Sequence, residues 1–246
     1  MSGHSKWHNI QARKGKADAA RGKIFTKIGR EISVAAKGNP NPDTNSKLAD
    51  AIAKAKANNM PNDNIQRCIK KAAGELGSAN YETLVYEGYG VGGSALIINT
   101  LTDNKNRTAG DVRSTLSKGG GELGSTGCVS YMFDNKGLLV VERTIDLDED
   151  TVTEYAIEAG ADDIVVQDDA YEIYTAPAAF SGVRKYLEEK GLSFLEADVR
   201  MIPQSKITLS EENTEKFIKL LDKLEDLDDV QDVYHNVELP DEDEEE

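Results

Sequence analysis

Residues 84–98, LVYEGYGVGGSALII, decide the fold class of this chain. Two short runs rich in Val, Ile and Tyr flank a group of glycines, a pattern typical of a β-hairpin. Residues 88–93 also match GxGxxG, which in dinucleotide-binding folds leads into a helix. Here residues 94–101 predict a strand instead. The sequence therefore favours a glycine hairpin loop over a phosphate-binding turn.

Residues 1–79, on the N-terminal side of this hairpin, predict only helices. One amphipathic helix covers residues 16–37, a second follows a cap at Asp43, Thr44 or Asn45, and a third follows Pro61. Gly and Pro at residues 38–42 end the first helix, because proline cannot continue one. Each apolar stripe is too narrow for an independent helix. We therefore expect a three-helix bundle.

Strands and helices alternate on the C-terminal side. We expect a helix at 107–118 capped by Asn106 or Thr108, two strands at 128–133 and 137–142 around a turn, and a helix at 210–226. The polar cluster at 103–108 has an alternative role, a surface contact made by Arg107 and Arg113. Together with the N-terminal bundle, this alternation predicts an α+β multidomain chain.

Charge is divided sharply along the sequence. Residues 1–80 hold fifteen Lys or Arg and six Asp or Glu, a net charge of +9, whereas the other 166 residues carry −24. A polyanion responds to the local surface more than to the total charge of −15. The division predicts that the N-terminal segment contacts phosphate. Residues 241–246 are all acidic and predict a disordered tail, which either aids solubility or competes with nucleic acid for the basic segment.

Basic residues on the first helix recur at steps of 7, 4, 3 and 7 from residue 16 to residue 37, so they share one stripe. Trp7, the only tryptophan, stands among basic residues. Aromatic and basic side chains together suit unpaired nucleic acid, although Trp7 could equally anchor the arm to the bundle. The candidate nucleic-acid-binding residues are Lys6, Trp7, Arg13, Lys14, Lys16, Arg21, Lys23, Lys27 and Arg30. No helix offers obvious base specificity.

Other classes of function find little support. His4 and His8 are four residues apart and His235 is distant, too few ligands for zinc, so we expect no metal and no cofactor. Cys68 and Cys128 are expected to be small buried residues in a cytoplasmic protein. No apolar run approaches the roughly 18–20 residues of a membrane span. Without a nucleophile and base in credible proximity, the chain is expected to be no enzyme.

Seven separated motifs carry a resemblance to a known family. They are GHSKW at 3–7, RGKIF at 21–25, NMP at 59–61, YEGYG at 86–90, DNKNRT at 103–108, MIP at 201–203 and VYHN at 233–236. The chain resembles the YebC family of transcriptional regulatory proteins, which includes a mitochondrial translational activator of cytochrome oxidase. The likeness runs from about residue 2 to residue 238. Val91 and Cys128 depart from the family's frequent Pro and Ser.

The resemblance implies three domains, with the last inserted into the middle one. The expected boundaries are 1–79 for the basic helical domain, 80–134 with 204–240 for the middle α/β domain, and 135–203 for the inserted α/β domain. The resemblance also implies a cytoplasmic, non-enzymatic protein without a membrane or small-molecule partner. Its partner would be promoter DNA for a transcriptional regulator. The alternatives are ribosomal RNA, for a factor relieving stalling at proline-rich stretches, and a protein bound by the acidic α/β body.

Overall fold

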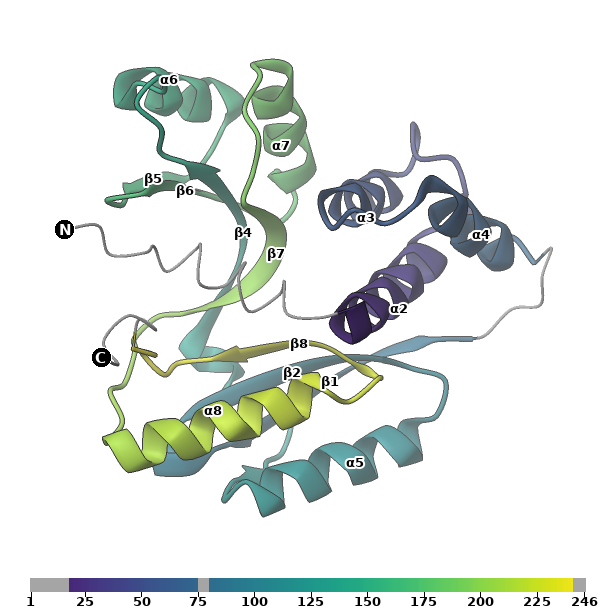
Figure 1. Ribbon diagram of the computed structural model, residues 1–246, viewed down its shortest axis with the longest axis vertical. Coiled ribbons are helices and arrows are strands. Elements are labelled where there is room, and N and C mark those ends of the chain that lie inside the picture. Colours follow the sequence, from purple (N-terminus) through teal and green to yellow (C-terminus); the bar gives the residue numbers. More distant parts are fainter. Residues whose placement is uncertain (1–17, 75–79, 241–246) are drawn as a thin grey trace. The chain divides into compact units, whose positions relative to one another are not determined.

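The structure, a computed structural model, describes residues 18–74 and 80–240 (Figure 1). The acidic tail at 241–246 and every candidate residue before residue 18 lie outside these ranges. The chain divides into two compact units, one containing residues 21–134 with 203–239 and the other containing residues 135–202. Each unit is described by itself below.

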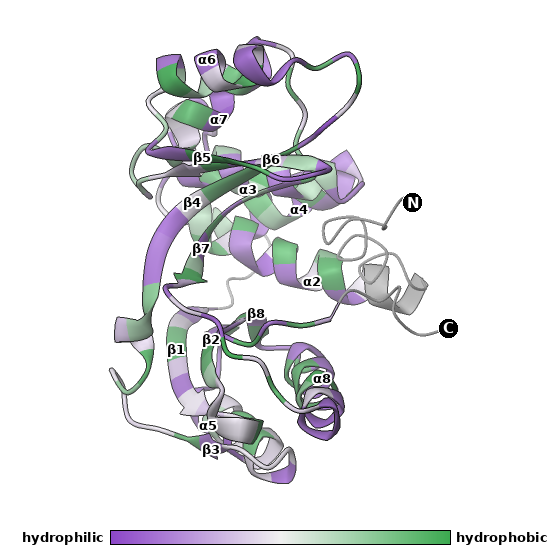
Figure 2. Ribbon diagram, turned by 90° about the vertical axis from the view of Figure 1, so that its left-hand side faces the viewer, coloured by the Kyte–Doolittle hydropathy of each residue, from purple (hydrophilic) through white to green (hydrophobic). Residues whose placement is uncertain are grey.

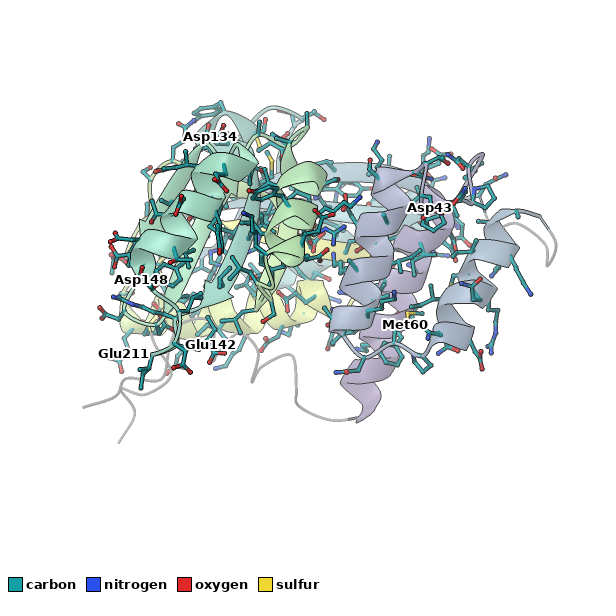
Figure 3. The ribbon with its side chains drawn as sticks, turned by 90° about the horizontal axis from the view of Figure 1, so that it is seen from above. Asp43, Met60, Asp134, Glu142, Asp148 and Glu211 are labelled. Atoms are coloured by element: carbon teal, nitrogen blue, oxygen red, sulfur yellow. The ribbon has the colours of Figure 1, made fainter. Side chains whose placement is uncertain are left out.

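Three helices open the first unit and confirm the predicted bundle. They are α2 (Asp18–Ala35), α3 (Ser46–Ala57) and α4 (Asn62–Ala72). Asn45 caps α3, since its Oδ1 accepts the Leu48 N–H at 3.2 Å, and its Nδ2 donates to the Ala35 carbonyl at 2.7 Å. One side chain thus starts α3 and holds the end of α2. Met60, labelled in Figure 3 between α3 and α4, closes the apolar core, which also contains Ile28, Ile32, Leu48, Ile65 and Ile69.

A four-stranded sheet of order β3-β1-β2-β8 follows in the same unit. Its strands are β1 (Glu82–Tyr89), β2 (Ala95–Thr102), β3 (Glu122–Leu123) and β8 (Val230–His235). β1 and β2 pair antiparallel along their whole length, and the Gly90 N–H donates to the Ser94 carbonyl at 2.8 Å across the loop. The GxGxxG sequence therefore spans a hairpin, as its following apolar run predicts.

Helices α5 (Lys105–Lys118) and α8 (Glu211–Glu225) pack on one face of this sheet (Figure 1). Their apolar stripes meet Leu96 and Ile98 of β2 in a core that includes Val112, Leu116, Phe217, Leu220 and Leu224. The predicted caps Asn106 and Thr108 were wrong. Asn104 begins α5, because its Oδ1 accepts the Arg107 N–H at 3.1 Å.

The second unit is built on a sheet of order β5-β6-β4-β7. Its strands are β4 (Phe133–Glu142), β5 (Asp163–Val166), β6 (Ala170–Thr175) and β7 (Glu196–Pro203). Helices α6 (Glu149–Ala159) and α7 (Phe180–Glu189) bury Val152 and Val183 against Leu139 and Ile173 of the sheet. Both helices carry hydrophobic and hydrophilic residues (Figure 2), as expected of helices that cover one face. The α+β class is confirmed.

The predicted strand at 128–133 was wrong. Residues 130–132 form a short 3-10 helix, and β4 runs unbroken through the expected turn. The carboxylate of Glu87, only 5% exposed, accepts the N–H groups of Gly127, Val129 and Ser130 at 2.8, 2.9 and 2.8 Å. These backbone groups therefore donate to a side chain on β1 and not to a β-ladder.

Candidate nucleic-acid interface

The structure describes the side chains of three of the nine candidate residues. Lys23, Lys27 and Arg30 lie on α2, and their spacing of four and three residues puts them on one side of that helix. Arg21 belongs to the same helix, but its side chain lies outside the described part. Lys6, Trp7, Arg13, Lys14 and Lys16 precede the described residues. They remain predictions from the sequence.

The described α2 cations contact the chain's own α8 and the loop that follows it. Lys23 Nζ lies 2.7 Å from Asp226 Oδ1, and Lys27 Nζ donates to the Glu225 carbonyl at 2.9 Å. The carbonyls at the end of α8 carry the negative end of its dipole, which attracts ammonium groups. Burial lowers the pKa of Lys27, against which Glu225 and Asp232 act by favouring its charged form. The predicted phosphate-binding stripe thus already has anionic partners.

Arg30 makes the most enclosed of these contacts. Its Nη1 donates to Asp229 Oδ1 at 2.9 Å, to the Leu101 carbonyl at 3.2 Å and to the Asp228 carbonyl. The guanidinium also lies over the ring of Tyr81, 5.3 Å from its centroid. The side chains of Arg30 and Asp229 are only 15% and 7% exposed. Arg30 is therefore a buried link between α2 and the sheet rather than a free cation.

Asp229 is the centre of this polar cluster. Arg107 Nη2 lies 2.7 Å from Asp229 Oδ2, and Thr108 Oγ1 donates to the same oxygen at 2.8 Å. Burial alone would raise the pKa of Asp229, but hydrogen bonds from Arg107 and Thr108 and the nearby guanidinium charges lower it. Arg107 is thus paired with Asp229 although its side chain is 46% exposed, and Arg113 is also exposed on α5.

A second set of cations, absent from the predicted site, lies on α3 and α4. We call it the α3–α4 cationic surface, and its members are Lys47, Lys56, Arg67, Lys70 and Lys71. All five are exposed, and none forms an ion pair with another residue of the described ranges. The sequence signal was available, because Arg67, Lys70 and Lys71 stand at i, i+3 and i+4 outside the apolar stripe of α4.

The end of this surface meets the end of α2. Lys71 and Lys37 line the same shallow hollow with Asn80 and Tyr81, and Lys37 Nζ donates to Asn80 Oδ1 at 3.2 Å. Lys70 and Lys71 complement the negative end of the α4 dipole, a structural role that Arg67, farther from that end, does not share. The bundle thus presents lysine and arginine side chains to solvent from more than one helix.

Other chemistry has few groups to work with in the described ranges. They contain no group of three or more His, Cys, Asp or Glu side chains placed to hold a metal ion. Cys68 and Cys128 are free and half-buried, and burial raises the pKa of both thiols. Between residues 18 and 240, leaving out 75–79, no helix has the length and apolar character needed to span a membrane.

Comparison with known proteins covers nearly the whole chain. The profile "TACO1/YebC protein N-terminal domain" matches residues 5–75, and "TACO1/YebC second and third domain" matches residues 81–237. A "probable transcriptional regulatory protein" of Hathewaya histolytica is 61% identical over 241 residues, 98% of each chain. One of Clostridium tetani is 59% identical over 243 residues, 98% of this chain and 99% of the relative.

A solved structure shares the fold. The crystal structure of a conserved hypothetical protein from Aquifex aeolicus matches with a TM-score of 0.85 at 44% sequence identity, over 98% of this chain and 100% of the other. The architecture described above therefore recurs in a crystallised relative over almost its full length.

Proposed function

Since the chain belongs to the TACO1/YebC family, we propose that it is a non-enzymatic regulator of gene expression that binds nucleic acid through its basic N-terminal domain. Relatives that share 57% or more of its sequence are named probable transcriptional regulatory proteins. Transcriptional control through DNA is accordingly the first candidate. The observation that carries the proposal is the division of charge between residues 1–80 and the remainder.

Part of the positive charge of residues 1–80 lies on the exposed surface of α3 and α4. The α3–α4 cationic surface is exposed and makes no ion pair with the described residues, so its charges are free to neutralise phosphates. Each neutralised phosphate releases counterions, and that release drives association with a polyanion. The acidic α/β part of the chain repels the same polyanion, which restricts binding to the basic domain.

Ribosomal RNA is the second candidate, in a factor that acts on translating ribosomes and relieves stalling at proline-rich stretches. The composition of the α3–α4 cationic surface favours it over an operator-reading module. Four of its five members are lysines, which act on phosphate as point charges, and phosphate contacts position a protein without reading bases. Trp7, next to Lys6, would add stacking on unpaired bases.

Two paired measurements test the proposal. With about six phosphates neutralised on duplex DNA, a plot of log affinity against log salt should have a slope of roughly −5. A flat plot for duplex DNA and for ribosomal RNA alike would overturn nucleic-acid binding and leave the acidic body as a protein-binding adaptor. A DNA regulator should prefer its operator over random duplex by at least ~10³. A ribosome factor should instead co-sediment with ribosomes and show no such preference.

A further inference from the structure

The α2 cations and their hydrogen-bond partners fall into two zones. The outer zone comprises Lys23 on Asp226 and Lys27 on the Glu225 carbonyl. The inner zone comprises Arg30 on Asp229. In Figure 1, α2 lies beside the C-terminal end of α8 and the start of β8. Both zones therefore belong to one contact surface within the first unit, but their exposure differs.

The outer zone is more open than the inner zone, although Lys27 within it is half-buried. The side chains of Lys23 and Asp226 are 47% and 71% exposed, so water and salt screen their attraction. Glu225 and Asp226 also stand at the C-terminal end of α8, where a negative charge opposes the helix dipole. These two acids thus do not stabilise α8 itself. Asp226 instead pairs with Lys23 of α2, and the Glu225 charge favours the charged form of Lys27.

The inner zone is enclosed. Arg30 and Asp229 are 15% and 7% exposed, and Arg30 also donates to the carbonyls of Leu101 and Asp228. Removing the guanidinium would leave a buried carboxylate short of one of its two cations, which is costly in a low-dielectric site. A phosphate group arriving from solvent could displace the outer contacts far more easily than this one.

We propose that residues 225–226 at the end of α8 are an intramolecular competitor for phosphate, which holds Lys23 and Lys27 in the free protein and releases them when nucleic acid binds. This regulation rests on the proposed function. Arg30 stays on Asp229 throughout, so the bundle remains docked while the outer half of α2 changes partner. The consequence is weaker binding to isolated phosphates, because only a polyanion that offers several phosphates together displaces both contacts.

The test compares two double variants of the full-length chain that remove the same charge. Glu225→Gln with Asp226→Asn removes both carboxylate charges of the competitor, including the Asp226 partner of Lys23, and leaves the Glu225 carbonyl and Asp229 in place. Glu211→Gln with Glu212→Gln removes two charges from the start of α8, where Figure 3 labels Glu211. The fifteen-residue helix separates the two ends by roughly 20 Å, about twice the screening length at 0.1 M salt. The two double variants therefore have the same net charge but differ in the distance of the changed residues from α2.

Affinity for a single-stranded RNA and for a DNA duplex is measured at 0.1 M and 0.5 M salt. We expect the competitor variant to bind about three- to fivefold more tightly than wild type at 0.1 M, with the gain lost at 0.5 M. The control variant should differ from wild type by less than about 1.5-fold. Equal affinities of the two variants, with wild type still showing a steep salt slope, would overturn the competitor and keep the proposed function.

A second measurement follows the contact directly. Hydrogen exchange of the last turn of α8, where the Asp226 N–H donates to the Asp222 carbonyl, should accelerate when RNA or DNA is added, because the Lys27 ammonium leaves that end. Unchanged exchange on a saturating polyanion would overturn the release of Lys27. If the affinity of wild type for RNA and for DNA shows no salt dependence, the proposed function fails. This outcome differs from equal affinities of the two variants and from unchanged hydrogen exchange.

Discussion

The cationic face of α2 and the α3–α4 cationic surface are similar in sequence and opposite in surroundings. Lys23 and Arg30 on α2 meet the carboxylates of Asp226 and Asp229, and Lys27 meets a backbone carbonyl of the same segment, residues 225–229. Lys70 and Lys71 on α4, like the rest of their surface, are exposed and form no ion pair with the described part of the chain. Positive charge on a helix therefore predicts a nucleic-acid-binding surface only where acidic residues of the same chain do not already pair with it.

The two faces are hard to distinguish from the sequence alone, because the α2 cations and their partners are far apart along the chain. Arg30 and Asp229 are 199 residues apart, and Lys23 and Asp226 are 203 apart. Helical periodicity relates only residues that lie within a few turns of one another. The pairing is decided by where β8 joins the sheet, which is a property of the tertiary fold.

Replacing Asp229 should have the largest effect, because it removes the buried carboxylate that Arg30 of α2 contacts. Asp229→Ala leaves Arg30 and Arg107 without their shared carboxylate, and we expect the free energy of unfolding to fall by about 3 kcal/mol. Urea unfolding at pH 7 measures it. Asp229→Asn, which keeps the volume and one acceptor oxygen, should lose less. A loss below about 1 kcal/mol for Asp229→Ala would show that α2 is held mainly by its apolar core.

Neutralising the α3–α4 cationic surface tests the other half of the comparison. Arg67→Gln with Lys70→Gln and Lys71→Gln should weaken nucleic-acid binding by about 100-fold at 0.1 M salt and reduce the magnitude of the log–log slope by about 3. The unfolding free energy should hardly change, since these side chains are exposed.

The matched control for this variant removes three cations from the acidic body. Lys216→Gln, Lys219→Gln and Lys223→Gln change the exposed side of α8 by the same charge. This control should weaken binding by less than about threefold, because these lysines lie among acids rather than on the basic domain. Equal losses in both triple variants would mean that net charge, and not the bundle surface, governs affinity.

Acidification probes β8, the strand that follows the acidic partners of α2. His235 on β8 packs edge-on to Phe217, with ring centroids 5.2 Å apart, and its Nδ1 accepts the Val237 N–H at 3.2 Å. Burial lowers its pKa to about 4, from about 6.5 in an unfolded chain. The unfolded state therefore binds a proton first as the pH falls, and stability declines between pH 6.5 and pH 4.

This titration should contribute a loss of about 2 kcal/mol in unfolding free energy between pH 7 and pH 5. His235→Gln removes the titrating group and keeps an acceptor for Val237, so its stability should depend less on pH across this interval even if it is lower throughout. Urea unfolding at several pH values measures the difference between the two slopes. Parallel curves for wild type and variant would contradict a depressed His235 pKa.

Much of the fold was predictable because its signals are local. The apolar stripe of α8, the breaks at residues 38–42 and Pro61, and the hairpin loop at residues 90–94 all depend on near neighbours. The incorrect strand at 128–133 and the incorrect caps of α5 depended on distant or competing groups. Glu87 holds the backbone of residues 127–130 from about 40 positions away, and Asn104 lies in a run of polar residues any of which could cap.

The candidate site was less predictable for the same reason. Charge counting identified the basic domain, but it could not show that residues 225–229 face α2 while α3 and α4 face solvent. From the sequence, the acidic tail at 241–246 was expected either to aid solubility or to compete for the basic segment, and that tail lies outside the described residues. The structure places a different acidic segment, the end of α8, against the predicted site.

The smallest expected effect separates a structural role for that segment from a regulatory one. Asp226→Asn alone loses a solvated ion pair with Lys23, worth at most about 0.5–1 kcal/mol, and gains a few tenths by removing a negative charge from the α8 C-terminus. The two effects nearly cancel, so the unfolding free energy should change by less than about 0.5 kcal/mol. Thermal and urea unfolding beside Asp229→Asn measure it. A loss of more than 1 kcal/mol in unfolding free energy would mean that the Asp226–Lys23 pair stabilises the fold, as the Asp229–Arg30 pair does.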